Sequence, residues 1–231
     1  MTGASARESL GHDEPDAFDR QAARYDAWYD APLGSVAFRE EQDALRPLLA
    51  GLSYPRLEVG VGSGRFAAAL DVAVGIDPAP AALALAARRG IRVAVAQGER
   101  LPFPEATFGG VLFLTALCFV GNPLAALLEA RRVLRPEGRI VLGLLPSEGP
   151  WGQHYRALAA AGNAYYQRAH FFTRAELASL FAAAGLRPVR ARSALFWPPA
   201  GGPVGGTARE GDDLAAGFSA LLLGVARTTP V

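Results

Sequence analysis

The sequence predicts a doubly wound α/β domain, in which a mostly parallel sheet is covered by helices on both faces. Five short apolar runs without regular polar alternation lie between residues 56 and 146, as expected of strands buried on both sides. Stretches rich in alanine and leucine, long enough to be helices, separate these runs. With 231 residues, of which 51% are hydrophobic and 19% charged, the chain is large enough for one full core.

The N-terminal part is predicted to differ from the rest of the chain. Residues 1–16 are polar and are expected to form a disordered tail, because they bury too little apolar surface to offset the entropy of ordering. Residues 17–50 are predicted to form helical segments broken at Pro32 and Gly34, with aromatic side chains at helical spacing. We expect residues 17–231 to fold as a single domain, with residues 17–50 as one part of a lid.

The remaining elements are predicted in a regular order. The apolar runs indicate five strands, at 56–62, 72–77, 91–97, 109–117 and 139–146. The stretches between them indicate helices, at 63–70, 78–90 and 122–138. An aromatic segment at 147–172 is predicted to be an insert that forms the second part of the lid, followed by a helix that ends at Gly185. Two closing strands are expected at 189–199 and 216–227, joined by a flexible glycine-rich connection.

Composition argues against several classes of partner. The net charge is +1 and no block of like charges occurs, so nucleic acid is not expected as a partner. The N-terminus lacks an apolar signal region, and the longest apolar run, Val111–Val120, is about half of what a membrane span needs. We therefore expect a cytoplasmic protein without a membrane partner. The single cysteine, Cys118, excludes an internal disulfide and a multi-thiolate metal site, and no metal is expected.

The most informative motif is the glycine-rich turn after the first predicted strand. Gly60, Gly62 and Gly64 are spaced G-x-G-x-G, and Glu58 precedes them by two residues. A dinucleotide site uses G-x-G-x-x-G, whose turn faces a pyrophosphate. A carboxylate beside the turn would repel a pyrophosphate but suits a ligand that carries an ammonium and a sulfonium. Asp77 ends the second predicted strand, where it can accept hydrogen bonds from ribose hydroxyls.

Four stretches together carry a resemblance to a known family: "EVGVGSGRF", "GIDPAP", "GERLPFPEATFGGVLF" and "LLEARRVLRPEGRIVLG". They resemble the class I S-adenosylmethionine-dependent methyltransferases, in the ubiquinone/menaquinone-methyltransferase-like (methyltransferase type 11) branch. The resemblance covers about residues 18–185. It implies a Rossmann-like sheet of seven strands in the order 3-2-1-4-5-7-6, with S-adenosylmethionine bound at the ends of the first four strands.

The resemblance also implies roles for individual residues. Glu58 and the glycine backbone would hold the methionine part of S-adenosylmethionine, and Asp77 the ribose. Gln97 stands where the family often has an acid for the adenine amino group, and its amide oxygen can accept the same bond. Thr115 would lie near the methyl group. The implied cofactor-binding residues are Tyr25, Glu58, Gly60, Gly62, Gly64, Asp77, Gln97, Gly98, Glu99 and Thr115.

The methyl acceptor is expected to bind between the N-terminal aromatic helix and the insert. Methyl transfer from a sulfonium needs mainly orientation and exclusion of water, and a general base is optional. His154 and His170 are the bases available in the insert at neutral pH, and with Tyr155 they form the candidate catalytic set. His170 also precedes a predicted helix start, which would explain it without catalysis. An aromatic lining favours a small acceptor that is apolar or cationic.

Several functions remain open at this point. Methyl transfer to N, O, S or C of a small molecule is predicted, with a small amine slightly favoured. C- or O-methylation of a quinone or natural-product precursor is the alternative. A non-catalytic S-adenosylmethionine-binding regulator is the alternative of another class, although it would be expected to lose Glu58 or Asp77. A nicotinamide-dependent reductase is disfavoured by the glycine spacing and by the absence of lysine, and an arsenic methyltransferase by the single cysteine. We expect a monomer or homodimer.

Overall fold

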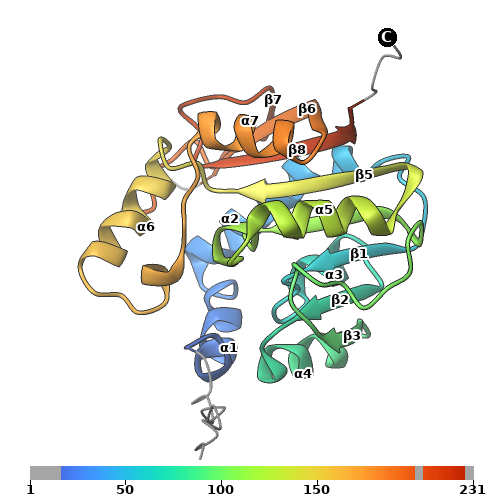
Figure 1. Cartoon of the computed structure of the whole chain (residues 1–231). Helices are drawn as coiled ribbons and strands as arrows, with labels where there is room; N and C mark the ends of the chain where they lie inside the picture. Colours follow the sequence, from blue (N-terminus) through green and yellow to red (C-terminus); the bar gives the residue numbers. More distant parts are fainter. Residues whose placement is uncertain (1–16, 201–204, 227–231) are drawn as a thin grey trace, which may run out of the picture.

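The computed structural model describes residues 17–200 and 205–226, which form one open sheet with helices on both faces (Figure 1). The expected disorder of residues 1–16 lies outside the described residues. The sheet has the strand order β3-β2-β1-β4-β5-β8-β6-β7. The doubly wound fold class is therefore confirmed.

The first five strands are parallel and form the half of the sheet that carries the glycine-rich turn. They are β1 (Arg56–Val59), β2 (Val74–Asp77), β3 (Arg92–Val95), β4 (Phe108–Leu114) and β5 (Leu134–Leu144). β8 (Phe218–Val225) is antiparallel to both β5 and β6 (Leu186–Ala194) and lies between them. This reproduces the implied order 3-2-1-4-5-7-6, with β8 in the place of the seventh strand.

One short strand was not predicted. The sheet has eight strands because β7 (Arg209–Glu210) adds to the edge beside β6, within the connection expected to be flexible. Glu210 accepts hydrogen bonds from Arg190 and Arg192 of β6. The count of seven strands was therefore wrong by one edge strand, which these arginine contacts hold against β6.

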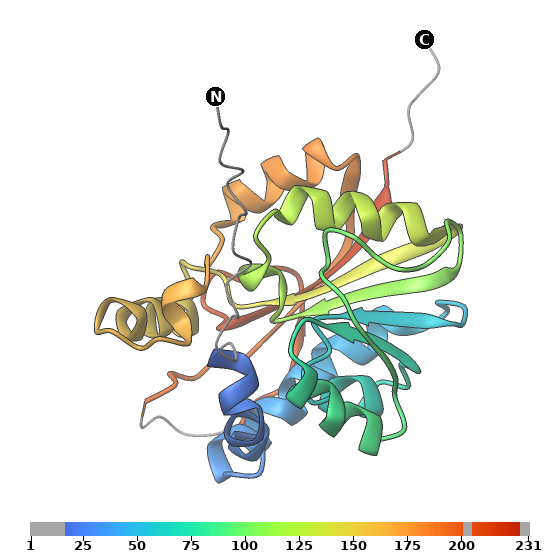
Figure 2. The ribbon, with the colours of Figure 1, turned by 60° about the horizontal axis from the view of Figure 1, so that its bottom comes forward.

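Alternate residues of the central strand β4 face two separate cores. Leu112 and Leu114 pack with α2 (Pro32–Leu49), α3 (Arg65–Ala69) and α4 (Pro80–Arg88). Val111 and Phe113 pack on the other face with α5 (Pro123–Val133) and α7 (Arg174–Ala183). Figure 2 shows α5 and α7 on one side of the sheet and α2 and α4 on the other. All seven residues of β4 are buried, which explains why the strand reads as a continuous apolar run.

Local signals set the starts of the helices. Proline occupies the first turn of α2, α4, α5 and α6, where its missing N–H costs nothing. The Asn122 side chain accepts a hydrogen bond from the Ala125 N–H at 3.0 Å and caps α5. Thr173 and Glu176 form a capping box at the start of α7.

The lid is smaller than the sequence indicated. Nine residues of α2 are buried, and the helix packs against β5, β6 and β8 as a layer of the core. Only α1 (Ala17–Trp28) from the range 17–50 extends beyond the sheet. It faces the insert, which consists of α6 (Pro150–Ala160) and the short helix η2 (Tyr166–Arg168). From the range 17–50 predicted as a lid, α2 thus covers the sheet with its apolar face, and α1 faces the insert.

An ionic cluster joins α1 to the glycine-rich turn. Asp26 of α1 accepts hydrogen bonds from Ser63 Oγ at 2.5 Å, Arg65 Nε at 2.7 Å and Arg89 Nη2 at 2.9 Å. Burial alone would raise the pKa of Asp26, but these three donors together lower it to about 2. A second arginine bond, from Arg65 Nη2 to Asp30 Oδ2 at 2.6 Å, lies at the surface.

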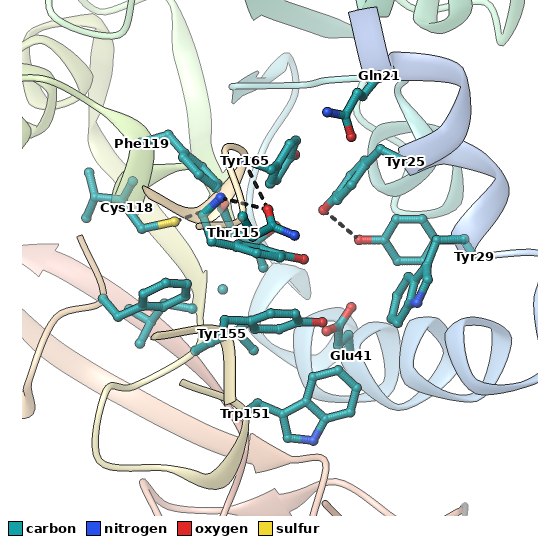
Figure 3. A pocket seen from close by; sticks show the side chains of 18 of the residues that line it. Gln21, Tyr25, Tyr29, Glu41, Thr115, Cys118, Phe119, Trp151, Tyr155 and Tyr165 are labelled. Carbon is teal, nitrogen blue, oxygen red and sulfur yellow. Dashed lines mark hydrogen bonds between the residues drawn. The ribbon is translucent and has the colours of Figure 1, made fainter. Parts of the chain in front are cut away.

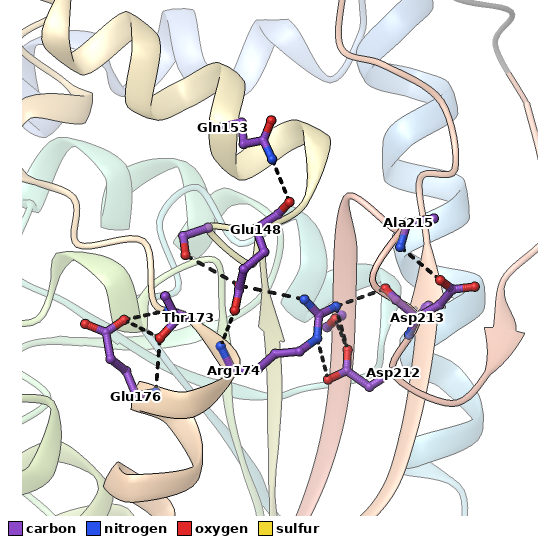
Figure 4. Close-up of polar contacts among 11 residues, drawn as sticks. Glu148, Gln153, Thr173, Arg174, Glu176, Asp212, Asp213 and Ala215 are labelled. Carbon is purple, nitrogen blue, oxygen red and sulfur yellow. Dashed lines mark hydrogen bonds and ion pairs between the residues drawn. The ribbon is translucent and has the colours of Figure 1, made fainter.

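A further ionic cluster fixes the base of the insert (Figure 4). Arg174, at the start of α7, pairs with Asp212 at 2.9 Å, and its backbone N–H donates to Glu148 Oε1 at 2.9 Å. Glu148 lies two residues before α6, and Asp212 lies in the segment between β7 and β8. The insert therefore begins at a point tied to two other parts of the fold.

No helix among the described residues is both long enough and apolar enough to cross a membrane.

We predict that Gly64→Ala lowers the free energy of unfolding by about 2–4 kcal/mol. Gly64 has φ +77°, and a Cβ atom there would lie 2.8 Å from Ala86 Cβ and 2.9 Å from Ala86 Cα. Gly90→Ala is the control, because Gly90 has φ +82° but no atom within 4 Å of an added Cβ. Urea unfolding should show a loss of only about 1 kcal/mol for Gly90→Ala. Equal losses in the two variants would contradict the packing role.

We predict that Asp26→Asn lowers the free energy of unfolding at pH 7 by about 2 kcal/mol. The folded-state pKa of Asp26, about 2, is below the usual value of 3.8 for an aspartate. The stabilisation is therefore complete above pH 3.8 and is lost as the pH falls through about 2. Asp30→Asn, at a side chain that is 68% exposed, should cost under about 1 kcal/mol. The measurement is the free energy of unfolding at a series of pH values. If the difference in this free energy between wild type and Asp26→Asn stayed constant down to pH 2, the prediction would be refuted.

Candidate functional site

Two adjoining cavities lie at the carboxyl ends of the parallel strands, where ligands bind in open α/β sheets. The first, the strand-end cavity, has a volume of about 620 Å³ and is lined by the ends of β1 to β4. The second, the aromatic cavity, has a volume of about 610 Å³ and lies between α1 and the insert. Five residues line both cavities: Tyr25, Tyr29, Thr115, Phe119 and Tyr165. A ligand in one cavity therefore lies next to a ligand in the other.

The glycine-rich turn forms one wall of the strand-end cavity and is bound to β2. The N–H groups of Gly60 and Val61 donate to the Ile76 carbonyl at 2.8 and 2.9 Å. The Gly62 N–H donates to Asp77 Oδ2 at 2.9 Å. Gly60 has φ +73°, and a Cβ atom there would lie 2.5 Å from Ala116 Cβ. Glycine at this position therefore leaves the backbone open to the cavity and close to the end of β4.

Glu58 places a carboxyl group without a partner at the same wall. It is the last but one residue of β1 and is only 2% exposed, and its Oε2 has no hydrogen-bond partner among the described residues. Burial, and after it the charge of Asp77, raise the pKa of Glu58 well above its usual range. A buried acceptor of this kind is stabilised by a cationic donor such as an ammonium group.

The far side of the strand-end cavity follows β3. Gln97, Gly98 and Glu99 all line it. An added Cβ at Gly98 would lie 3.0 Å from Val59 Cγ1, so the chain passes closely over β1. Glu99 Oε1 accepts the Asn122 N–H at 3.0 Å, which ties this segment to the start of α5. Arg168 of η2 also lines the cavity and brings a basic group to it.

Thr115 lies where the two cavities meet and has a strained backbone. It follows β4 directly and has φ +51°, a conformation that a β-branched residue rarely adopts. Its N–H donates to the Gly143 carbonyl at 2.7 Å, and its hydroxyl donates to the Leu114 carbonyl at 2.8 Å. These bonds hold the chain in a sharp turn at the end of β4, with Thr115 still bonded to β5.

Aromatic rings form most of the second cavity (Figure 3). Tyr25 of α1 stacks on Tyr165 of the insert, with ring centroids 5.4 Å apart and planes 17° apart. The Tyr25 and Tyr29 hydroxyls are 3.2 Å apart. Across the cavity, Tyr155 of α6 packs against Tyr166 with centroids 4.4 Å apart. The contact between Tyr25 and Tyr165 therefore bridges the two lid segments.

One acidic side chain lies within this aromatic lining. Glu41 of α2 is 5% exposed, and its Oε2 has no hydrogen-bond partner among the described residues. Figure 3 shows its carboxylate on the α2 side of the cavity, between Tyr155 and the α1 tyrosines. Burial, and after it the charge of Glu40, raise the pKa of Glu41 to about 8. Glu40 itself accepts from the Leu195 N–H and Trp197 Nε1, at 3.2 and 3.0 Å.

Most of the residues singled out from the sequence lie together. The strand-end cavity is lined by nine of them, namely Tyr25, Glu58, Gly60, Gly62, Asp77, Gln97, Gly98, Glu99 and Thr115. Tyr155 lines the aromatic cavity. Gly64 does not line either cavity: it is the N-cap of α3 and packs on Ala86 of α4. The structure gives Gly64 a packing role in place of the expected contact with a ligand.

The two histidines are not brought to the cavities. Neither His154 nor His170 lines the strand-end cavity or the aromatic cavity. The His170 side chain is 60% exposed, and its Nε2 lies 3.2 Å from Glu176 Oε1 at the start of α7. The His154 ring lies beside Tyr155 with centroids 5.3 Å apart. The geometry does not support a general-base role for either residue.

Sequence reasoning missed Glu41 and Arg168. For Glu41 a signal was available, because it lies four residues from both Ala37 and Leu45, which are on the buried face of α2. An acid on the apolar face of a core helix indicates a functional group. No comparable signal marked Arg168, which reaches the strand-end cavity only through the fold of the insert.

Comparisons with known proteins agree with this arrangement. A family model described as "Methyltransferase domain" matches residues 57–142, from β1 into β5. An uncharacterised protein of Mycobacterium tuberculosis is 48% identical over 183 residues, or 79% of this chain and 64% of the relative. This chain thus spans less than two thirds of the length of that relative. A demethylmenaquinone methyltransferase of Mycolicibacterium vanbaalenii is 32% identical over 142 residues, covering 57% of this chain and 59% of that protein.

Solved structures show the same likeness. A crystal structure from Thermotoga maritima, described as an S-adenosylmethionine-dependent methyltransferase and possible histamine N-methyltransferase, superposes with a TM-score of 0.78. It is 28% identical and covers 89% of this chain and 97% of its own. The matched domain carries the glycine-rich turn, the buried Glu58 and the strand order described above. The chain therefore carries the methyltransferase domain and the fold of the class I S-adenosylmethionine-dependent methyltransferases.

Proposed function

We propose that the strand-end cavity binds S-adenosylmethionine and that the aromatic cavity binds a small-molecule methyl acceptor, with a small amine favoured. The observation that carries this proposal is the shared wall of the two cavities. Thr115, Tyr25 and Tyr165 line both. A methyl group bound at the end of β4 would therefore face a nucleophile held between α1 and the insert.

The residues of the strand-end cavity fit the cofactor. Bound S-adenosylmethionine supplies an electrophilic methyl group on a positively charged sulfur. Glu58, buried and without a partner for Oε2, matches the methionine ammonium. Asp77 is oriented by the N–H groups of Gly62 and Ala79 toward the ribose position. Gln97, Gly98 and Glu99 line the side expected for adenine.

The aromatic cavity supports transfer to a neutral amine. Burial raises the pKa values of the Tyr155 and Tyr165 hydroxyls, so both stay protonated and act as hydrogen-bond donors rather than bases. A neutral amine needs no strong base, whereas a phenol or carbon nucleophile usually does. The rings also exclude water and attract a nitrogen that becomes positive as it is methylated. The Thermotoga maritima neighbour, described as a possible histamine N-methyltransferase, supports the same class of acceptor.

A second candidate is C-methylation of a quinone precursor. The observation that favours it is the likeness to demethylmenaquinone methyltransferases over part of the chain. An apolar aromatic lining would also accept a flat quinone ring by stacking. A methyl-transfer screen of pooled amines, phenols and quinone precursors, with S-adenosylhomocysteine release as the readout, distinguishes the two candidates.

We predict that the protein binds S-adenosylhomocysteine and does not bind NAD, and that Asp77→Ala weakens S-adenosylhomocysteine binding about ten- to a hundredfold. The loss corresponds to removing hydrogen bonds from a carboxylate to ribose hydroxyls, about 1.5–3 kcal/mol. Titration calorimetry measures both ligands. Glu105→Gln, at an exposed carboxylate outside both cavities, is the control and should bind normally. An unchanged dissociation constant in Asp77→Ala would remove this residue from the site, and micromolar NAD binding would refute the assigned cofactor.

We predict that Tyr155→Ala and Tyr165→Ala, made separately, each raise KM for the acceptor or lower kcat by about tenfold or more. Each substitution removes a ring that lines the aromatic cavity, with its stacking and its exclusion of water. Tyr155 lines only this cavity, so its loss should leave S-adenosylhomocysteine binding intact. Initial rates at varied acceptor concentration are the measurement. Unaltered kcat and KM in both variants would show that the acceptor binds elsewhere.

A further inference from the structure

We propose that Glu41 is the acceptor-binding residue that selects a cationic amine, by holding the ammonium group of the acceptor within the aromatic cavity. This inference rests on the proposed function, which does not itself assign a role to Glu41. It concerns binding and orientation of the acceptor through an ammonium group that is not the nucleophile, because the nitrogen that attacks the methyl group must be neutral.

The first argument is the isolation of the carboxyl group. Glu41 is 5% exposed, its Oε2 has no partner, and no basic side chain pairs with it among residues 17–200 and 205–226. A carboxyl group buried without a partner is costly, and such groups in folded proteins are normally paired or hydrogen-bonded. The neighbouring acid Glu40 shows the contrast, since both of its oxygens accept hydrogen bonds. The hydrogen-bond donor or cation that would stabilise the Glu41 carboxyl group must therefore come from a ligand.

The second argument is the chemistry of the surrounding walls. Tyr25 and Tyr29 of the α1 region, Tyr155 of α6 and Trp28 all line the cavity that Glu41 enters. Aromatic faces attract cations, and a carboxylate among such faces binds an ammonium group through charge and through hydrogen bonds. A neutral quinone would leave Glu41 without a partner, and an acidic acceptor would be repelled by it. The lining thus matches a small, protonated, partly apolar amine.

The third argument is position. Glu41 lines the aromatic cavity but not the strand-end cavity, whereas Thr115 lines both. It comes from α2, which is packed into the core, so its backbone is fixed independently of the lid segments. Glu41 therefore provides a rigid anchor point in the cavity, against which the mobile part of an acceptor can be oriented toward the methyl group.

The charged and titratable groups that face Glu41 define its response to pH. Glu40 precedes it on α2, and Tyr25 of α1 and Tyr155 of α6 face it. Tyr29 faces it from the turn that follows α1. Cys118 and Arg24 line the same cavity. Burial raises the pKa values of the three tyrosine hydroxyls and of the Cys118 thiol, so they remain neutral near pH 7. Since the pKa of Glu41 is about 8, an ammonium group that binds at pH 7 should displace about one proton from it.

The test uses 2-phenylethylamine and its neutral isostere 2-phenylethanol as probes, titrated into the whole protein with and without saturating S-adenosylhomocysteine. We expect the amine to bind wild type at least tenfold more tightly than the alcohol. Glu41→Gln should lose this preference, with amine binding weakened about ten- to a hundredfold and alcohol binding unchanged. Asp43→Asn is the matched control, because it removes a carboxylate from the exposed face of the same helix. It should retain the preference of wild type.

Proton release gives a readout that a structural role would not change. Calorimetry at pH 7 in buffers of different ionisation heat should show about one proton released when the amine binds wild type, and none for Glu41→Gln. The affinity for the amine should rise with pH up to about 8, where Glu41 becomes ionised, and should fall above about 10, where the amine itself loses its proton. Glu41→Gln should not lower the thermal midpoint, because a buried, unpaired carboxyl group is replaced by a neutral amide.

The outcomes separate this inference from the proposed function. Equal binding of amine and alcohol to wild type, no binding of the amine, or retention of the preference by Glu41→Gln would overturn the role of Glu41. If S-adenosylhomocysteine binds while one of these results is found, only the inference fails. If S-adenosylhomocysteine does not bind at all, the proposed function fails, and the titrations without it still decide the role of Glu41.

Discussion

The site depends on the ionic cluster around Asp26. Three donors from the turn after β1 and from the end of α4 converge on this one carboxylate, which belongs to α1. Because Ser63 and Arg65 are part of the glycine-rich turn and the start of α3, the cluster fixes α1 relative to the strand-end cavity. Tyr25 precedes Asp26 directly, and Tyr29 follows it by three residues. The ionic cluster that attaches α1 therefore also positions Tyr25 and Tyr29, which line both cavities.

The two buried acidic residues of the site lie in similar environments. Glu58 and Glu41 each have an Oε2 atom without a partner, and burial raises the pKa of both. Each lies at the edge of a different cavity, and each would be stabilised by a cation. A methyltransferase whose cofactor carries an ammonium and whose acceptor carries a second amine would satisfy both. The fold thus leaves two buried carboxyl oxygens without a hydrogen-bond partner where two ligands are expected to meet.

The base of the insert and the part of it that faces the cavity are held by different kinds of contact. Its base is tied down by Arg174 and Glu148, and α6 is anchored by the fully buried Trp151, whose Nε1 donates to the Trp197 carbonyl at 2.8 Å. Toward the cavity, the contacts are between rings, as in the Tyr25–Tyr165 stack. Ring contacts of this kind contribute about 0.5–1.5 kcal/mol each beyond burial. The base of the insert is thus held by ionic and hydrogen bonds, whereas its aromatic tip contributes ring contacts to the wall of the cavity.

The sequence by itself determined the parallel half of the sheet and the cavity for the cofactor. Continuous apolar runs such as that of β4 identify strands buried on both faces, and residues that end such strands, including Glu58, Asp77 and Thr115, must meet at one edge. Tertiary structure alone decided which groups line the acceptor cavity. Whether Glu41, His154 or His170 points into a cavity depends on the packing of α2, α6 and the loop before α7, which local sequence patterns do not specify. The same holds for Gly64, because only the close approach of Ala86 shows that its hydrogen side chain is needed for helix packing rather than for a ligand.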